Sequence, residues 1–262
     1  LSGNRIHIKV EIPRKLYWAD KLGLLIQADV PNAWGDPSEQ MFEEHWKCFE
    51  DMLKRDHNHP SIYQWTPFNE TWGRPGNSEA ARFHDRLLSD VYYLTKNLDY
   101  RPCHDTSGGY HVKTDIWSYH NYEPDAAKLK DRLTLKSADD VPTLNKDREA
   151  KYEGQPYLLD EYGGIKWVVG KQYAANTWGY GQGPKSVDEF YTRLTALTDT
   201  LLGLEYMCGY TYTQLTDVEQ EQNGVFNYDR TAKFDAAKLK AIFGKEPAWF
   251  VKMKAEYKKS KK

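Results

Sequence analysis

The strongest constraint on the fold of this chain is the regular alternation of short apolar, β-prone runs with longer segments of helical periodicity. The apolar runs lie at residues 5–11, 22–31, 61–70, 101–107, 114–122, 155–164 and 204–215. Segments with helical spacing lie between them at 13–23, 35–57, 78–98, 124–133 and 186–203, and a last one follows at 231–244. Such alternation is typical of βα units that build a parallel sheet. The sequence therefore predicts an α/β fold.

A TIM-type (β/α)8 barrel is the architecture that this order of elements favours. The 262 residues are ordinary for one such barrel, which we expect over residues 1–245. The seven apolar runs are one fewer than a closed barrel needs, so we expect the first βα unit to be missing. A barrel with a gap leaves unpaired strand edges. We therefore expect the chain to self-associate as a homo-oligomer, or to be only marginally stable, unless another segment fills the gap.

Boundary signals are clearest for the helix within residues 35–57. Asp36 suits the N-cap, Pro37 the first helical position, and Glu39 can close a capping box. Apolar residues recur at helical spacing in this helix and are expected to face the core: Phe42, Trp46, Phe49 and Leu53. The corresponding stripe at 78–98 is Ala80, Phe83, Leu87, Val91, Leu94 and Leu98. At 186–203 it is Val187, Phe190, Leu194, Leu197 and Leu201.

Charge and hydropathy exclude several classes of partner. The 36 Lys and Arg nearly balance the 38 Asp and Glu, for a formal net charge of −2, so there is no electrostatic case for a nucleic-acid partner. No apolar run approaches the roughly 20 residues that span a bilayer, and we expect no membrane partner. The basic segment 246–262 is expected to be a solvated C-terminal tail. No secretory signal opens the chain, but such a signal would precede residue 1, so localisation stays open.

Metal and disulfide sites find no support in the spacing of their usual ligands. The cysteines are far apart and are expected to be buried thiols: Cys48, Cys103 and Cys208. Three histidines lack the helical pairing and matching carboxylates of a zinc site: His57, His59 and His104. The acids of the loop at 216–224 lack the EF-hand pattern and are expected to be solvated: Asp217, Glu219 and Glu221. We expect no metal and no cofactor.

Several predicted strands begin apolar and end in polar or charged residues. These residues are Asp29, Asn69, Glu70, Asp105, His120, Tyr122, Asp160, Glu161 and Gln214. In a barrel of parallel strands the carboxyl ends converge on one rim, where catalytic groups lie. A strand that enters a loop also becomes polar for purely structural reasons, so each residue taken alone is ambiguous. Two glutamates that end different apolar strands favour the functional interpretation.

Glu70 and Glu161 could together hydrolyse a glycosidic bond. Two carboxyl groups about 5 Å apart are the machinery of a retaining glycosidase, in which one protonates the leaving oxygen and the other attacks the anomeric carbon. Proximity helps to separate their pKa values, because like charges disfavour double ionisation. Asn69, beside the acid, could hold a substrate hydroxyl.

The aromatic content of 14% suits both a core and a sugar site, because Trp and Tyr offer a flat apolar face and a polar edge. Trp65, inside a strand, is expected in the core, and Trp72, after that strand, could line the pocket. Trp117 and Trp178 lie near the predicted rim and suit sugar stacking. Asp29 could bind a sugar hydroxyl or cap the following turn.

The segment HPSIYQWTPFNE (residues 59–70) resembles the acid/base segment of glycoside hydrolase family 2, the family of β-galactosidases, β-glucuronidases and β-mannosidases. PYLLDEYGG (156–164) resembles its nucleophile strand, and YTYTQLTDVEQEQNGVFNYDR (210–230) its last barrel strand and following loop. HIKVEIPRKLYWADKLGLLIQADVP (7–31) is similar to its second and third strand regions. The resemblance covers nearly the whole chain in order. It implies a retaining, exo-acting glycosidase, most like a β-galactosidase, whose partner is a carbohydrate substrate.

By this resemblance, Glu70 is the acid/base, Glu161 the nucleophile and Asn69 the residue that binds the sugar 2-hydroxyl. Tyr122 would hydrogen-bond the nucleophile, and His120 would face the sugar. Gln214 would lie at the rim, at the end of the last strand.

This chain departs from the family's pattern in two ways. Thr66 stands where the family usually has Gly or Ser, and Tyr63 and Gln64 replace its usual aliphatic residues. The family's first barrel strand and helix, with its jelly-roll and immunoglobulin-like β domains, would precede residue 1 and would be partners of this chain.

Two alternatives remain open from the residues alone. An endo-acting barrel glycosidase of another family would share the Asn-Glu pair and the second Glu. A non-catalytic carbohydrate-binding fragment of a larger enzyme would bind sugar through the same rim without turning it over.

Overall fold

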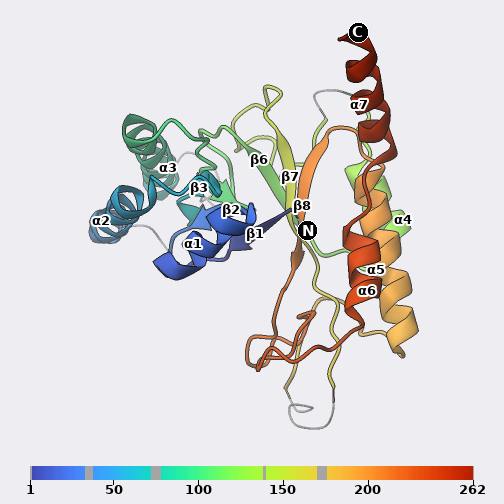
Figure 1. Cartoon of the computed structure of the whole chain (residues 1–262). Coiled ribbons are helices and arrows are strands. Elements are labelled where there is room, and N and C mark those ends of the chain that lie inside the picture. The colour runs from blue at the N-terminus through green and yellow to red at the C-terminus, as the bar shows by residue number, and fades with distance from the viewer. Residues whose placement is uncertain (1, 33–37, 72–77, 138–139, 170–175, 262) are drawn as a thin grey trace. The chain divides into compact units, whose positions relative to one another are not determined.

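The structure is a computed structural model of the chain and describes residues 2–32, 38–71, 78–137, 140–169 and 176–261. The chain divides into two compact units, whose elements are labelled in Figure 1. We call Ser2–Tyr119 with Thr143–Leu158 the N-terminal unit, and His120–Pro142 with Leu159–Lys262 the C-terminal unit. The chain passes from one unit to the other inside strands β6 (Trp117–Asn121) and β7 (Tyr157–Gly163).

A parallel three-stranded sheet forms the centre of the N-terminal unit. Its strands β1 (Gly3–Ile6), β2 (Leu25–Asp29) and β3 (Ile62–Thr66) pair in chain order. A second parallel pair joins β4 (Phe68–Asn69) to β5 (Thr106–Ser107). The run expected as one strand at 61–70 is therefore two strands, because Pro67 between them has no N–H to donate to a sheet.

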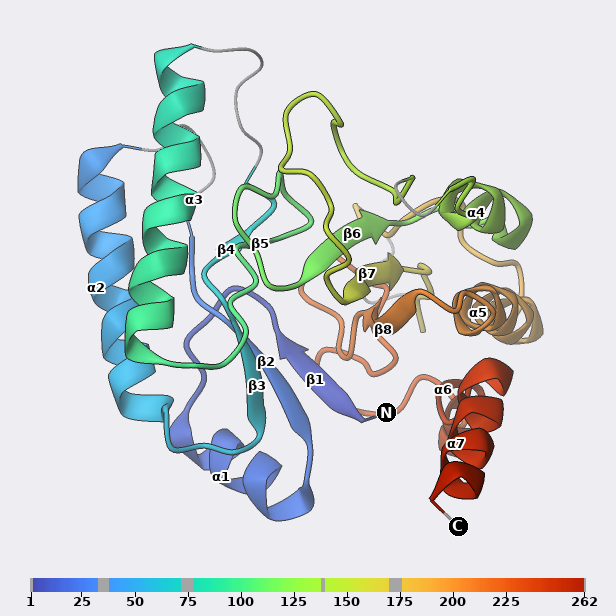
Figure 2. The same ribbon diagram turned by 90° about the horizontal axis from the view of Figure 1, so that it is seen from above.

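Helices α1 (Pro13–Leu22), α2 (Glu39–Asp56) and α3 (Glu79–Leu98) connect these strands, and α2 and α3 lie side by side on one side of them (Figure 2). The N-cap of α2 is Ser38, whose hydroxyl accepts a hydrogen bond from the Met41 N–H at 3.1 Å. Asp36 and Pro37, predicted for this helix start, lie outside the described residues.

The buried face of α3 is rotated relative to the predicted stripe. It consists of Ala81, His84, Leu87, Leu88, Val91, Tyr92 and Thr95. Leu98, predicted to face inward, is 48% exposed. The difference arises because polar residues with internal partners occupy the buried face. The Thr95 hydroxyl donates to the Val91 carbonyl at 2.7 Å, and the Tyr92 hydroxyl donates to Asp115 at 2.7 Å.

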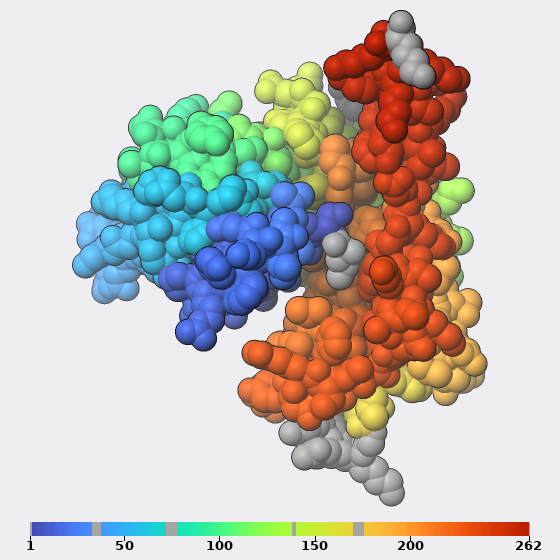
Figure 3. All heavy atoms as spheres, in the orientation of Figure 1, coloured from blue at the N-terminus to red at the C-terminus, as the bar shows by residue number. Residues whose placement is uncertain are grey.

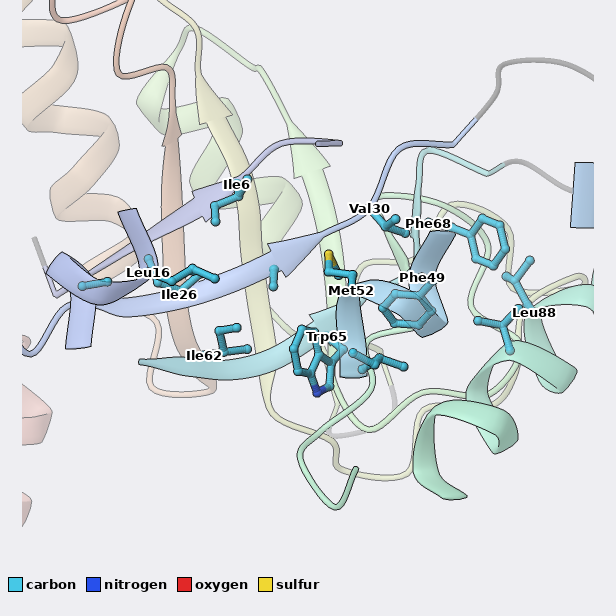
Figure 4. Close-up of a cluster of buried hydrophobic side chains, with 14 of the residues drawn as sticks. Ile6, Leu16, Ile26, Val30, Phe49, Met52, Ile62, Trp65, Phe68 and Leu88 are labelled. Carbon is cyan, nitrogen blue, oxygen red and sulfur yellow. The ribbon is translucent and has the colours of Figure 1, made fainter. Parts of the chain in front are cut away.

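The core of the N-terminal unit is built around Trp65, which lies between the strands and α2 (Figure 4). Trp65 is fully buried, as predicted. It meets Phe49 edge-on, with 6.4 Å between ring centroids, and the Arg101 guanidinium lies 4.8 Å from its ring. Phe42 and Trp46, also predicted to face inward, pack partly buried against the same core.

Strands β6, β7 and β8 (Met207–Thr213) form a three-stranded sheet in this order. Helices α4 (Ala126–Leu133), α5 (Val187–Leu202) and α6 (Ala236–Phe243) of the C-terminal unit form a layer beside β8 (Figure 1). α5 buries most of the predicted stripe: Phe190, Leu194, Leu197 and Leu201. Val187, in the first turn, is 37% exposed.

Each predicted strand segment overlaps a strand, although the one predicted at 5–11 does so only at residues 5–6, because β1 is Gly3–Ile6. The described strands form separate sheets of three, two and three rather than a closed barrel. The absence of a first βα unit stays a prediction.

The basic C-terminal segment contains helix α7 (Ala248–Ser260), drawn in dark red in Figure 3. No residue of this helix is buried. The segment is solvated, as predicted, but helical, because Ala, Lys and Met are good helix formers. Among the described helices, none combines the length and the apolar character that crossing a bilayer requires.

The three cysteines are free thiols with different exposures. Cys103 is buried, as predicted, whereas Cys48 and Cys208 are exposed, which corrects the prediction for these two. Cys48 lies on α2 next to Phe49 and points off the buried face.

Candidate active site

Glu161 lies on β7 in the C-terminal unit, and its side chain is 9% exposed. The Tyr122 hydroxyl donates a hydrogen bond to Glu161 Oε2. His120 lies beside it, with Nδ1 3.3 Å from Glu161 Oε2 and Nε2 3.3 Å from Asp160 Oδ1. Burial, together with the Glu161 charge, raises the pKa of the Tyr122 phenol far above its usual value, so this hydroxyl stays protonated as a donor. Tyr122 makes the contact with Glu161 that the resemblance implies.

Aromatic rings support Tyr122 from the opposite side. Tyr180 stacks on it with 3.4 Å between ring centroids and an interplanar angle of 4°. Gly164 permits this stack, because a Cβ there would lie 2.3 Å from the Tyr180 ring and 3.0 Å from the Tyr122 ring. Trp178 meets Tyr180 edge-on at 5.8 Å and is 46% exposed. Trp178 is thus one ring removed from Tyr122, the hydrogen-bond partner of Glu161, and a partly exposed indole suits sugar stacking.

Side chains at the end of β8 connect Tyr122 with a second carboxylate, that of Glu221. Thr213 Oγ1 lies 3.2 Å from the Tyr122 hydroxyl. The next residue, Gln214, donates its side-chain amide to Asn223 Oδ1 at 2.8 Å, and Asn223 donates to Glu221 Oε1 at 3.0 Å.

The acidic loop after β8 is more ordered than the predicted solvated loop. Burial, opposed by the hydrogen bond from Asn223 and reinforced by the charges of Glu161 and Asp217, raises the pKa of Glu221. Asp217 is buried and pairs with Lys233 at 2.7 Å. These two acids correct the prediction, because each has internal partners, whereas Glu219 is exposed, as predicted.

Asn69 ends β4 in the N-terminal unit and is held by neighbours on β1 and after β2. Arg5 donates to Asn69 Oδ1 at 2.5 Å and to Asp29 Oδ2 at 2.9 Å. Asn32 accepts the Asn69 N–H at 2.9 Å and donates to the Asn69 carbonyl at 3.2 Å. The amide of Asn69 is therefore fixed in orientation before any substrate binds.

Glu70 follows Asn69 with a backbone φ of 47°, in the left-handed region that side chains rarely adopt. Its N–H donates to the Ser107 carbonyl at 2.7 Å, which extends the β4–β5 pairing by one residue. Strained backbone of this kind is typical of functional sites, where the surrounding structure enforces it.

Three predicted site residues have surroundings that change their interpretation. Asp29 is 1% exposed and bound by Arg5, so it orients the arginine that holds Asn69. Trp117 is fully buried against His111 and Tyr152, so it has no free face for a sugar; it begins β6, whereas the site residues end that strand. Trp72 lies outside the described residues.

Sequence reasoning missed several residues that hold the predicted ones: Arg5, Asn32, Tyr180 and Asn223. Asn32 directly follows the strand predicted at 22–31, which was the available signal, whereas Arg5 opens the strand predicted at 5–11, where the carboxyl-end pattern did not point. Tyr180 lies in a loop of no regular period, and nothing local marks its stack on Tyr122. Glu70 and Glu161 belong to different units, so their pairing across one cavity stays a prediction.

A family model described as "Glycosyl hydrolases family 2, TIM barrel domain" matches residues 29–245. A Formosa agariphila protein named "Putative beta-glucuronidase" is 30% identical over 86 residues, which are 30% of this chain and 7% of that protein.

Solved structures share the fold at low identity. A Bifidobacterium dentium beta-glucuronidase complexed with coumarin-3-O-glucuronide is 18% identical, with a TM-score of 0.68 over 90% of this chain and 40% of that one. The beta-D-glucuronidase of Dictyoglomus thermophilum is 17% identical, with a TM-score of 0.67 over 94% of this chain and 45% of that one. The chain therefore spans less than half the length of these proteins.

Proposed function

Because the chain belongs to the glycosyl hydrolases of family 2, through their TIM barrel domain, we propose that it hydrolyses a terminal β-linked sugar with net retention of configuration. The observation that carries the proposal is the environment of Glu161, a largely buried carboxylate that accepts the Tyr122 hydroxyl and lies beside His120. The proposal assigns the acid/base to Glu70, which directly follows β4 with Asn69 beside it.

In the first step, Glu161 attacks the anomeric carbon while Glu70 donates its proton to the leaving oxygen, so that a covalent glycosyl-enzyme forms. Tyr122 keeps one lone pair of Glu161 engaged and so orients the other oxygen for attack. Asn69, with its amide fixed by Arg5, binds the 2-hydroxyl, where hydrogen bonds strengthen in the transition state.

In the second step, Glu70 takes a proton from water, and the resulting hydroxide attacks the anomeric carbon and releases Glu161. The two inversions restore the starting configuration. Only the two carboxyl groups and water take part in these bond changes.

Two sugars are candidates for the substrate. The resemblance of the motifs favours a β-galactoside. The names of the similar proteins, which are beta-glucuronidases, favour a β-glucuronide. Both reactions use the same two carboxylates and differ in the group that the sugar carries.

The roles of the two glutamates can be separated with Glu161→Ala and Glu70→Ala on a dinitrophenyl β-glycoside. Glu161→Ala should lower turnover about a thousandfold or more, because no nucleophile remains. Azide should then restore turnover and give the α-glycosyl azide, since it attacks from the side that Glu161 occupied. In Glu70→Ala, azide should give the β-glycosyl azide from the glycosyl-enzyme.

The matched control is Glu219→Ala, an exposed glutamate, which should keep wild-type turnover. More than a few per cent of activity in Glu161→Ala, or azide products of the opposite configuration, would refute the assignment. A 2-deoxy-2-fluoro glycoside should label Glu161; binding of sugar without labelling would indicate a non-catalytic carbohydrate-binding chain.

A further inference from the structure

We propose that Glu221 and Trp178 form a subsite that binds the hydroxyl groups of a neutral sugar and excludes a uronic acid. The inference rests on the proposed function and names its substrate class. It selects the galactoside type of substrate over the glucuronide type.

Backbone hydrogen bonds clamp Glu221 beside Trp178. The Trp178 N–H donates to the Gln220 carbonyl at 2.8 Å, and the Gln222 N–H donates to the Trp178 carbonyl at 2.9 Å. These two bonds form a parallel bridge between Trp178 and Glu221. The bridge places the backbone of Glu221 beside that of Trp178, a residue that is 46% exposed.

Glu221 connects to the Glu161 site through side chains of the same unit. Asn223 donates to Glu221 Oε1 and accepts from Gln214, whose predecessor Thr213 meets the Tyr122 hydroxyl. From the other direction, Trp178 contacts Tyr180, which stacks on Tyr122. Two separate series of contacts therefore connect Tyr122, which donates a hydrogen bond to Glu161, with the Trp178–Glu221 pair.

The chemistry of this pair suits a polyhydroxylated ring. The indole face packs against sugar C–H groups, and a carboxylate is a strong acceptor for hydroxyl donors. The Asn223 side-chain amide donates to Oε1 of Glu221. This bond fixes the orientation of the carboxylate, so that Oε2 can accept a hydrogen bond from a sugar hydroxyl.

A uronic acid would place its own carboxylate near that of Glu221, and like charges repel strongly where water is excluded. Two lysines among the described residues of this region have partners of their own: Lys166 donates to the Thr177 carbonyl at 2.5 Å, and Lys233 pairs with Asp217.

The test compares aryl β-galactoside with aryl β-glucuronide on the full chain, for the wild type, Glu221→Gln and the matched control Glu219→Gln. The wild type should prefer the galactoside. Glu221→Gln removes the charge but keeps the shape. It should lower kcat/KM for the galactoside about tenfold and narrow the preference over the glucuronide about tenfold or more. Glu219→Gln, on the same loop, should change neither value.

A second variant keeps the inference testable if Glu221→Gln does not fold. Glu221→Asp keeps the charge but shortens the side chain, so it should weaken galactoside turnover and leave the exclusion of glucuronide intact. A galactoside-to-glucuronide preference that Glu221→Gln leaves unchanged, or that Glu221→Asp abolishes, would overturn the inference.

The failure of the proposed function has a different signature, namely that neither glycoside is cleaved and Glu161 is not labelled. In that case the same comparison is made by binding, with methyl β-galactoside and methyl β-glucuronide as titrants of tryptophan fluorescence. The wild type should bind the galactoside at least about tenfold more tightly, and Glu221→Gln should close this gap. Equal affinity in the wild type would reject the subsite.

Discussion

Single residues of this chain owe their roles to partners that are distant in sequence. The strand-end pattern predicted the positions of Glu161 and Asn69, because a polar residue that ends an apolar strand is visible in the sequence. It could not predict that Arg5 reaches Asn69 across 64 positions, since such a contact depends on strand register. The contact of Tyr122 with Glu161 across 39 positions was implied only by the resemblance to the family. Trp117 shows the same limit, because only the structure reveals that its ring is enclosed.

His45 of α2 should make the stability of the chain depend on pH. It is 6% exposed, stacks on Phe68 with 4.3 Å between ring centroids, and burial lowers its pKa to about 4. Between pH 6.5 and about 4 the unfolded state binds a proton at this residue and the folded state does not. The free energy of unfolding should therefore fall by about 3 kcal/mol as the pH drops through this range.

Urea unfolding at pH 7 and at pH 4.5 measures this contribution. His45→Gln should flatten the decrease between the two pH values, because the titrating group is gone. His57→Gln, at the exposed C-terminal end of α2, should leave it as it is. An equal decrease in the wild type and in His45→Gln would contradict the prediction.

Secondary-structure elements were the part of the fold that periodicity predicted best. Helices α1 to α6 all lie where helical spacing placed them. One predicted strand is divided by Pro67, and one helix face is rotated by polar residues, and both differences depend on hydrogen bonding that periodicity does not report. The segment predicted as a C-terminal tail contains helix α7, and the first strand begins and ends earlier than predicted. The turn at the end of β7 is another feature that periodicity does not report. Gly163 and Gly164 both have positive φ there, at 84° and 55°.

Gly164→Ala should damage the site more than backbone strain alone explains. A matched control is Gly154→Ala, since Gly154 also has positive φ, 89°, but has nothing within 4 Å of a Cβ. Gly154→Ala should cost about 1 kcal/mol of unfolding free energy. Gly164→Ala should cost more and also lower kcat, because its Cβ would displace Tyr180 from Tyr122. Equal stability losses and equal kcat values in the two variants would show that the stack is not needed.

At the scale of the whole molecule, two strands are shared between the two compact units. The boundary between the two units falls within β6 and within β7, so each of these strands contributes residues to both units. A strand that loses half its residues to unfolding also loses the pairing of the rest. The division into two units could not be predicted from the sequence, because compactness emerges only from long-range contacts, and the single barrel domain over residues 1–245 stays a prediction.

Unfolding of the two units should therefore be cooperative. Phe49→Ala, in the core of the N-terminal unit, should cost roughly 3–5 kcal/mol. If the chain unfolds as one, native-state hydrogen exchange of the α5 amides in the C-terminal unit should accelerate by a matching factor. Unchanged protection of α5 would mean that the units unfold separately.

At Glu70, the residue that would make the folded state most stable differs from the residue that the proposed reaction needs. Glycine would relax this conformation and make the chain more stable by about 1 kcal/mol, yet it would delete the carboxyl group. Random mutagenesis that selects only for thermal tolerance should thus enrich Gly at position 70. Selection for turnover should hold the glutamate there despite its conformational cost.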